Sequence, residues 1–206
     1  MNTEMYNAKH YPDGTAYQAI RNADRKKPKN RVTGRKQQAS GKEFEDQLES
    51  MHRRLARDGI ALISKIPTAT KAIPHGNSVR WIPSEKTGCD YLGVYRGKAI
   101  ALEAKQSSTT TRWDLFSRGQ NNAKKKTVAE HQQRYLLKHR DCGGLAFVII
   151  RIKPTQSLYL IDIIDYMTLE KEAIQAGKSS IALGQFEKYR VVLKPRSADY
   201  LEGAIK

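Results

Sequence analysis

The 206-residue chain has little cysteine and no long apolar segment, and both shortages exclude classes of protein. Only Cys89 and Cys142 are present, which is too few for a disulfide scaffold. The longest apolar run, residues 143–150, is far shorter than the ~18 residues of a membrane-spanning helix. The first 18 residues are polar and have no apolar core, which argues against a secretory signal. We therefore expect a soluble protein of a reducing compartment such as the cytoplasm.

Acidic residues are also scarce: 37 Lys and Arg oppose 21 Asp and Glu, which gives a formal net charge of +16. A surplus of this size indicates partners rather than a fold. The usual partner is a polyanion, so nucleic acid is the first expectation. An anionic membrane surface is a weaker second because no basic amphipathic helix is evident. The hydrophobic share of 39% excludes wholesale disorder.

The positive charge is uneven along the chain. Residues 25–36 hold seven Lys or Arg and no acidic residue, together with a Pro and a Gly, which is typical of a flexible basic arm. Residues 15–24, before the arm, are compatible with a short helix. We divide the chain into a flexible basic region, residues 1–39, and a folded domain, residues 40–206.

The folded domain has an α/β pattern. Phe44, Leu48, Met51 and Leu55 recur at three- and four-residue spacing, which predicts an amphipathic helix over residues 41–58. The other predicted elements are a strand at 60–66, a long hairpin or loop at 67–88, a hairpin at 90–105, a helix at 128–140, strands at 145–152 and 158–164, a helix at 165–177 and a last strand at 186–193. This order predicts a mixed central β-sheet flanked by helices.

The hairpin at residues 90–105 allows a specific chemical prediction. Two β-rich runs flank Arg96-Gly97, and a two-residue turn there makes the numbers of paired residues add up to 193. Asp90 then lies directly across from Glu103, at the Cβ separation of about 4.5–5.5 Å that opposite residues have. Alternation along the strand places Lys105 on the same face as Glu103. Two carboxylates so placed repel each other unless a cation lies between them.

A divalent metal would resolve this repulsion. Hard oxygen ligands that leave room for water and phosphate suit Mg²⁺. The metal would activate water and stabilise charge on a phosphodiester, while the ammonium of Lys105 positions the nucleophile or offsets negative charge. The alternative is a surface ion network in a non-catalytic, DNA-binding architectural protein. An Asp followed by Glu-x-Lys arises readily by chance in a chain with 28% charged residues.

The same segment resembles a known family. Residues 87–105, with the sequence TGCDYLGVYRGKAIALEAK, resemble the core motif of the RecU family, Holliday junction resolvases of Gram-positive bacteria and their phages. Further stretches match in the same order, namely the helix motif at 41–45, the strand that leads into the family's stalk at 65–68, and the helix and strand at 130–136 and 147–150. The resemblance spans roughly residues 41–162 and implies a restriction-endonuclease-like core with a PD-(D/E)xK site.

The resemblance implies roles for individual residues. Asp90 and Glu103 would be ligands of Mg²⁺, for which Mn²⁺ would substitute, and the backbone carbonyl of Ala104 would complete the coordination. Lys105 would be the catalytic lysine. Glu45, from the helix motif, would be a further metal ligand or would hold a water molecule.

Three neighbouring positions are more ambiguous. Glu43 follows Ser40 at the spacing of a capping box, which favours helix stabilisation over catalysis. Gln132 matches a motif position that lies near the site in such nucleases, and we count it with the catalytic residues. A single His on a helix, such as His131, is more often a surface or packed residue than a ligand.

By this resemblance the chain would be a structure-selective endonuclease of recombination and repair that resolves four-way DNA junctions. Two symmetric nicks require two sites related by a two-fold axis, so we expect a homodimer. The hairpin or loop predicted at residues 67–88 corresponds to the family's stalk and is shorter than that stalk. Basic side chains would contact DNA phosphates without reading sequence; they are Arg25, Lys26, Lys27, Lys29, Arg31, Arg35, Lys36, Lys71, Arg80, Lys86, Lys124, Lys125 and Lys126.

Three points stay open at this stage. A nuclease of the same fold that cuts duplex or flap DNA is an alternative to a junction resolvase. A recombinase is a conceivable further partner that the sequence does not identify. A phage origin would place the protein in the cytoplasm of a bacterial host.

Overall fold

The computed structural model describes residues 41–67, 69–76, 78–83, 87–118, 124–192 and 197–202. The chain divides into two compact units, Met1–Glu43 and Phe44–Lys206, and almost all of the described residues belong to the second. In the first unit only residues 41–43 are described, and they are helical. The predicted basic region at residues 1–39, the predicted cap Ser40 and the predicted DNA-binding residue Lys86 lie outside the described residues.

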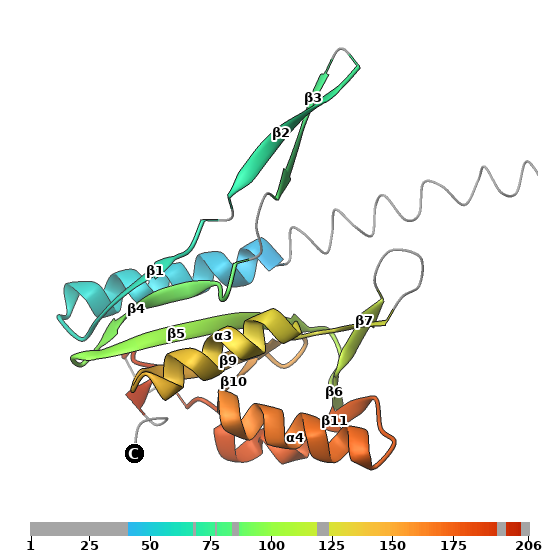
Figure 1. The fold of residues 1–206 in the computed structure, drawn as a ribbon. Helices are drawn as coiled ribbons and strands as arrows, with labels where there is room; N and C mark the ends of the chain where they lie inside the picture. Colours follow the sequence, from blue (N-terminus) through green and yellow to red (C-terminus); the bar gives the residue numbers. More distant parts are fainter. Residues whose placement is uncertain are drawn as a thin grey trace, which may run out of the picture. The chain divides into compact units, whose positions relative to one another are not determined.

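A five-stranded sheet forms the centre of the second unit (Figure 1). Its strands lie in the order β1-β4-β5-β9-β10. Neighbouring strands are antiparallel except for β5 and β9, which run parallel and therefore need a long crossover that includes α3. The strands are β1 (Ala61–Lys65), β4 (Tyr91–Tyr95), β5 (Lys98–Ser107), β9 (Leu145–Ile152) and β10 (Ser157–Asp162). The predicted α/β class with a mixed central sheet is confirmed.

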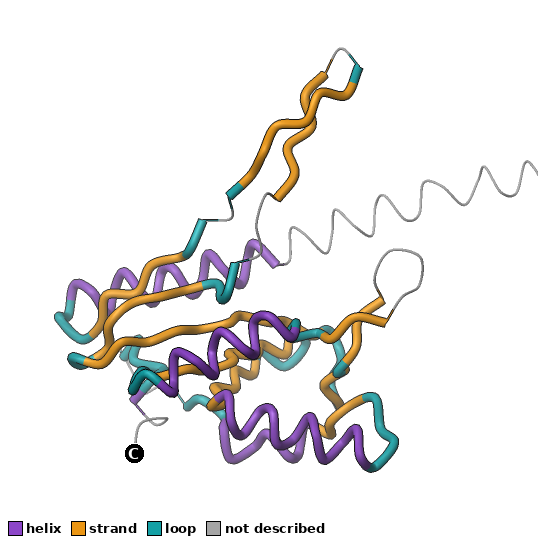
Figure 2. Tube along the Cα trace, viewed as in Figure 1, coloured by secondary structure: helices purple, strands orange, loops and turns teal. Residues whose placement is uncertain are grey.

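Helices cover both faces of this sheet (Figure 2). The helix over residues 41–57 buries Phe44, Leu48 and Leu55 against one face. The opposite face packs against α3 (Glu130–Asp141) and α4 (Ile163–Gln175). Because β9 is covered on both sides, it is a nearly continuous apolar run rather than an alternating one. The three predicted helices are confirmed to within a few residues at each end.

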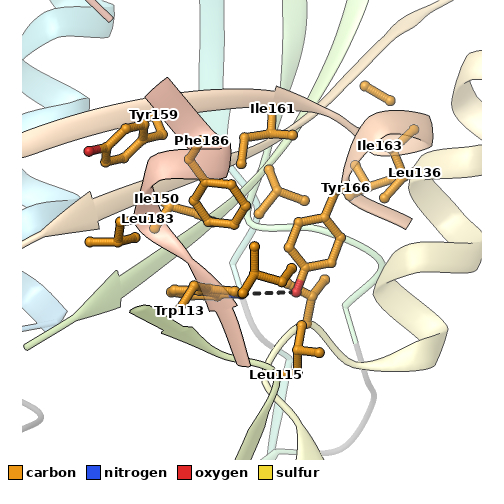
Figure 3. Packing of buried hydrophobic residues seen from close by; sticks show 14 of the residues in the cluster. Trp113, Leu115, Leu136, Ile150, Tyr159, Ile161, Ile163, Tyr166, Leu183 and Phe186 are labelled. Carbon is orange, nitrogen blue, oxygen red and sulfur yellow. Dashed lines mark hydrogen bonds between the residues drawn. The ribbon is translucent and has the colours of Figure 1, made fainter. Parts of the chain in front are cut away.

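A cluster of aromatic and aliphatic side chains fills the space between the sheet and α4 (Figure 3). At its centre the indole Nε1 of Trp113 donates a hydrogen bond to the hydroxyl of Tyr166, with 3.2 Å between the two atoms. Trp113 lies on β6 (Arg112–Asp114), which pairs with β11 (Ser180–Ala182). The sequence pattern predicts no element between residues 106 and 127. Besides β6, this segment contains the paired strands β7 (Phe116–Arg118) and β8 (Lys124–Lys126).

The predicted last strand at residues 186–193 is wrong. The chain there forms the 3₁₀-helix η2 (Leu183–Tyr189), followed by a single bridge between Tyr159 and Arg190. Leu183 and Phe186 are both buried, and their spacing of three residues matches the period of a 3₁₀-helix, so one face of η2 packs on the core. The β-branched residues that suggested a strand include Val192, which is 83% exposed.

The segment at residues 67–88, for which the sequence predicts either a long hairpin or a loop, forms a hairpin. Strands β2 (Thr70–His75) and β3 (Ser78–Pro83) pair with each other in a separate two-stranded sheet. Its register places Lys71 opposite Ile82 and Ile73 opposite Arg80.

Candidate active site

The β4–β5 hairpin has the register that the sequence predicts. Tyr95 pairs with Lys98 and Tyr91 with Leu102, so the numbers of paired residues add up to 193. Arg96 and Gly97 both have positive φ angles, 45° and 81°, as a two-residue type I′ turn requires. Asp90, just before β4, is thereby brought beside the end of β5.

Asp90 is tied to β5 by its backbone and by its side chain. Its N–H donates to the carbonyl of Leu102 across 3.1 Å, and its Oδ2 accepts from the N–H of Ala104 across 2.9 Å. In an extended strand the N–H and C=O of one residue point to the same edge. The carbonyl of Ala104 therefore points to the edge where the Asp90 carboxylate lies.

Glu103 is a fully buried carboxyl with an uneven set of partners. Its Oε1 accepts hydrogen bonds from the ammonium of Lys105 and from Nε2 of Gln132, the latter at 2.6 Å. Within the part of the chain that the structure describes, its Oε2 has no hydrogen-bond donor. A buried polar atom without a partner is costly and calls for an explanation.

The electrostatics of Glu103 favour a cation beside its carboxyl. The pKa of this carboxyl is raised to about 8, chiefly by burial. Lys105 opposes the rise, whereas the negative charge of Asp90 adds to it. Two carboxyls held this close cannot both ionise easily unless a positive charge joins them.

The donor set fits a hard divalent cation. Asp90, Glu103 and the Ala104 carbonyl offer oxygen atoms at one strand edge, and oxygen is the donor that Mg²⁺ prefers. Across the described residues, no three His, Cys, Asp or Glu side chains gather closely enough to hold a metal on their own. Such a metal would therefore have two carboxylates and a carbonyl as ligands and would leave positions for water and phosphate.

Gln132 is oriented by the start of α3. Its Oε1 accepts from the N–H of Ala129 across 3.0 Å, which closes a capping arrangement at the helix N-terminus. With the oxygen so engaged, the amide nitrogen is the atom that faces Glu103. The helix start thus fixes which end of Gln132 reaches the site, and the sequence could not show this.

Glu45 lies apart from the Asp90–Glu103 pair and contacts a residue that the sequence prediction missed. Its Oε2 accepts from Nζ of Lys65 at 2.5 Å. The pKa of Lys65 is raised, first by this hydrogen bond and also by the charges of Glu45, Glu49 and Asp90. Lys65 ends β1 beside Tyr91, so the β1–β4 register brings it next to Asp90.

Gly88, two residues before Asp90, is a second residue that the sequence prediction missed. A Cβ at this position would come within 2.3 Å of the ring of Tyr135 on α3. The absence of a side chain lets the chain pass directly under that ring. Cys89, which follows, is fully buried, and burial raises the pKa of its thiol to about 12, so it is a core residue rather than a nucleophile.

The predicted DNA-binding residues that the structure describes fall into two groups, one on the β2–β3 hairpin and one on β8. Lys71 and Arg80 are exposed and share one face of the β2–β3 hairpin, because directly paired and alternate residues lie on the same side. The opposite face carries Val79 and Trp81, and the Trp81 side chain is 66% exposed. One face of the hairpin therefore carries both cations, beside the isoleucines with which they pair, and the other carries the exposed aromatic ring.

The Lys124–Lys126 cluster is strand β8, and its members differ. Lys125 is exposed, whereas Lys126 donates to the buried carboxylate of Glu170 at 3.0 Å. The charge of Lys126 is thus partly neutralised within the protein.

Comparisons with known proteins match this arrangement to one family. The model of the family described as RecU, recombination protein U, matches residues 39–204. A "Holliday junction resolvase RecU" of Bacillus pumilus is 29% identical over 178 residues, which cover 82% of this chain and 80% of the relative. Another of the same name, from Geobacillus sp., is 28% identical over 156 residues, with 72% and 73% covered.

Among solved structures, Archaeoglobus fulgidus Hjc, described as a Holliday junction resolvase from an archaeal hyperthermophile, aligns with a TM-score of 0.41 and 15% identity. The alignment covers 71% of this chain and 91% of Hjc. No helix in the described part of the chain is both long enough and apolar enough to cross a membrane. The family model spans the sheet, the helices on both its faces and the Asp90–Glu103 site, and this chain belongs to the RecU family.

Proposed function

We propose that this chain is a metal-dependent DNA endonuclease that resolves four-way (Holliday) junctions in recombination and repair. Family membership and the names of the relatives support the substrate. The observation that supports the chemistry best is the buried Glu103 carboxyl, which lies beside Asp90 with one oxygen open. The preferred cofactor is Mg²⁺, and Mn²⁺ is a substitute.

Asp90, Glu103 and the Ala104 carbonyl would hold the metal. When bound, a divalent cation supplies Lewis acidity toward the phosphodiester and an activated water nucleophile. Gln132 and Lys105 both contact Oε1 of Glu103, which leaves Oε2 free to face a ligand. Partners of this kind orient a ligand carboxylate and keep its open oxygen in place.

Lys105 supplies a positive charge at the site. Its ammonium contacts Glu103 and remains partly exposed, so it can also reach a phosphate that enters from solvent. There it would offset charge that develops on the phosphodiester. Glu45 and its partner Lys65 would approach the same phosphate from the side of the Asp90 carboxylate, with Glu45 as a further ligand or water-holding group.

The β2–β3 hairpin is suited to branched DNA. Lys71 and Arg80 would contact phosphates, as would Lys125 on β8. On the other face, the exposed ring of Trp81 would stack on a base at the branch point, an interaction worth about 1–3 kcal/mol. The basic arm at residues 25–36 would add non-specific affinity. Paired nicks would come from a homodimer in the cytoplasm.

The decisive experiment is cleavage of an end-labelled four-way junction with and without Mg²⁺, beside the variant Asp90→Asn. We expect two symmetric nicks by the wild-type protein, none without metal, and none by Asp90→Asn, while the variant still binds the junction. Asp114→Asn is the control because Asp114 is an exposed carboxylate on β6, and it should cleave normally.

Substrate controls distinguish the alternatives. Linear duplex and flap DNA of the same sequence should be cut at least about tenfold more slowly than the junction, and Trp81→Ala should narrow that difference. Equal cleavage of duplex would replace the junction resolvase with a general nuclease. A wild-type protein that binds DNA but never nicks it would support an architectural role instead.

A further inference from the structure

Arg151 is a buried cation on the face of the sheet opposite Glu103. Its neighbours Ile150 and Ile152 pack with the α3 and α4 side, so strand alternation places Arg151 on the side of the helix over residues 41–57. The residue is only 2% exposed. A buried charge is costly unless it is well hydrogen-bonded, and Arg in particular needs several acceptors in a fixed geometry.

The hydrogen bonds of Arg151 join two segments that carry site residues. Nε donates to Oε1 of Gln106 across 2.7 Å, and Nη2 donates to the same oxygen. Nη1 donates to Oε1 of Gln47 across 2.6 Å, and the guanidinium carbon lies 4.9 Å from the centre of the Phe44 ring. One side of the guanidinium thus holds β5 and the other holds the helix.

The two anchored segments are those that carry the site. Gln106 follows Lys105 directly, and the β5–β9 register sets it opposite Arg151. Phe44 and Gln47 lie on either side of Glu45 in the same helical turn. The planar guanidinium therefore spans from the end of the strand that bears Glu103 and Lys105 to the turn that bears Glu45.

We propose that Arg151 is a positioning residue that sets the place of Glu45, with its partner Lys65, relative to Glu103 and Lys105. This inference rests on the proposed nuclease function. A displacement of about 1 Å in a catalytic group lowers rates by about a hundredfold, so the loss of this connection slows cleavage without weakening DNA binding. Arg151 itself contacts neither metal nor DNA in this scheme.

Arg151→Met is the main test because it keeps an unbranched apolar side chain along the path of the arginine methylenes and removes the guanidinium. The substitution removes the guanidinium donors to the side-chain oxygens of Gln47 and Gln106; Gln47 is exposed, so its oxygen can accept from water instead, which limits the loss of stability. We expect single-turnover junction cleavage in Mg²⁺ to fall about ten- to a hundredfold. Junction affinity in EDTA should stay within about twofold because Arg151 is not at the surface.

A double-mutant cycle separates positioning from a general loss of structure. If Arg151 acts through Glu45, the Arg151→Met change slows cleavage much less in a Glu45→Gln background than in the wild type. Equal slowing in both backgrounds, or full cleavage by Arg151→Met, overturns the proposal. Asp199→Asn is the matched control, because Asp199 is a buried acceptor of hydrogen bonds from Tyr95 and Arg96 away from Glu45, and its loss should leave the rate unchanged.

Two further measurements keep the test decisive. Arg151→Lys retains the charge but lacks the rigid fork, so it should also lose about tenfold in rate; should Arg151→Met fail to fold, a full rate in Arg151→Lys overturns the proposal. Amide hydrogen exchange at residues 44–48 should accelerate in Arg151→Met relative to α4. This readout needs no cleavage, so an unchanged exchange rate contradicts the inference even if the wild-type protein proves not to be a nuclease.

Discussion

Two buried glutamates of this protein have the same kinds of partner but differ in how their oxygens are paired and in whether a second carboxyl lies beside them. Glu170 on α4 accepts from Lys126 and, through both oxygens, from Gln133. Glu103 on β5 accepts from a lysine and a glutamine as well, but through one oxygen only, and its other oxygen has no donor among the described residues. The second acidic group beside Glu103 is Asp90.

The difference separates a structural glutamate from one suited to bind a cation. A buried carboxylate whose oxygens are all paired stabilises the fold and has no further capacity for a ligand. A carboxylate that is paired on one side and crowded by a second carboxylate on the other gains stability when a cation arrives. The two glutamines are neighbours on α3, so a single helix supports both sites.

The largest expected effect comes from exchanging each glutamate for glutamine. Glu103→Gln should lower single-turnover junction cleavage by about 10³-fold, since a proposed ligand of the metal is lost. Glu170→Gln should cleave within about twofold of wild type. Its free energy of unfolding in urea should fall by about 2–4 kcal/mol, because Lys126 loses a buried partner.

In contrast to Glu170→Gln, the variant Glu103→Gln should not lose stability. The neutral amide loses the pairing with Lys105 but also removes the cost of burying a charge and the repulsion from Asp90, which together outweigh that pairing and raise the pKa of Glu103. The free energy of unfolding of the variant should therefore equal or exceed that of wild type in the absence of metal. The distinction between a structural and a cation-binding glutamate would fail in either of two cases. Glu170→Gln could abolish cleavage as Glu103→Gln does, or both variants could lose the same free energy of unfolding.

The neighbouring glutamines should show a smaller version of the same contrast. Gln132→Leu should lower cleavage about ten- to a hundredfold and weaken Mn²⁺ binding by a similar factor, as expected when a partner of a ligand is removed. Gln133→Leu should leave both unchanged and should lower the free energy of unfolding by about 1–3 kcal/mol, because Glu170 loses a donor. Calorimetric titration with Mn²⁺ and urea unfolding measure the two effects, and interchanged results would refute the assignment.

Local rules were sufficient to predict the Asp90–Glu103 pair. The Arg96-Gly97 turn fixes the hairpin register, and the register places one carboxyl opposite the other. Gln132 could be chosen only by family resemblance, because its approach to Glu103 depends on how α3 packs across the sheet. No local pattern predicts such a contact between residues 29 positions apart.

The structural glutamate and the last strand show what the sequence could not reveal. Glu170 and Gln133 sit on two helices whose meeting is a tertiary event, so neither residue could be identified from spacing alone. The strand expected at 186–193 followed β-propensity, which depends on context, and packing of Phe186 into the core favoured a 3₁₀-helix instead.

A third buried group tests whether an unpaired atom alone identifies a site. His52 is buried, its Nε2 lies 2.7 Å from the Tyr200 hydroxyl, and its Nδ1 has no partner among the described residues. Burial lowers the pKa of His52 to about 4. The unfolded chain binds a proton near pH 6.5 and the folded protein does not, so stability is lost as pH falls from about 6.5 to 4.

His52→Phe should remove this acid sensitivity. The wild-type protein should lose up to about 3 kcal/mol more than the variant between pH 7 and pH 4.5, measured by urea unfolding at each pH. Junction cleavage by the variant at pH 7.5 should stay within about twofold, because His52 contacts the core residues Tyr91 and Tyr200 and none of the proposed site residues among those described. Parallel stability curves for the two proteins would show that His52 ionises normally in the fold.

The smallest expected effect concerns two lysines that are adjacent in β8. Lys125 is exposed and free to contact a phosphate, whereas Lys126 is already paired with Glu170. Each phosphate contact adds about 0.9 to the slope of log affinity against log salt concentration. Lys125→Gln should therefore reduce the slope for junction binding by about that amount at unchanged stability. Lys126→Gln should leave the slope almost unchanged and lower the free energy of unfolding.

If Lys126→Gln reduced the slope as much as Lys125→Gln, the ammonium of Lys126 would be shared between Glu170 and DNA, and the fully paired glutamate would no longer be purely structural.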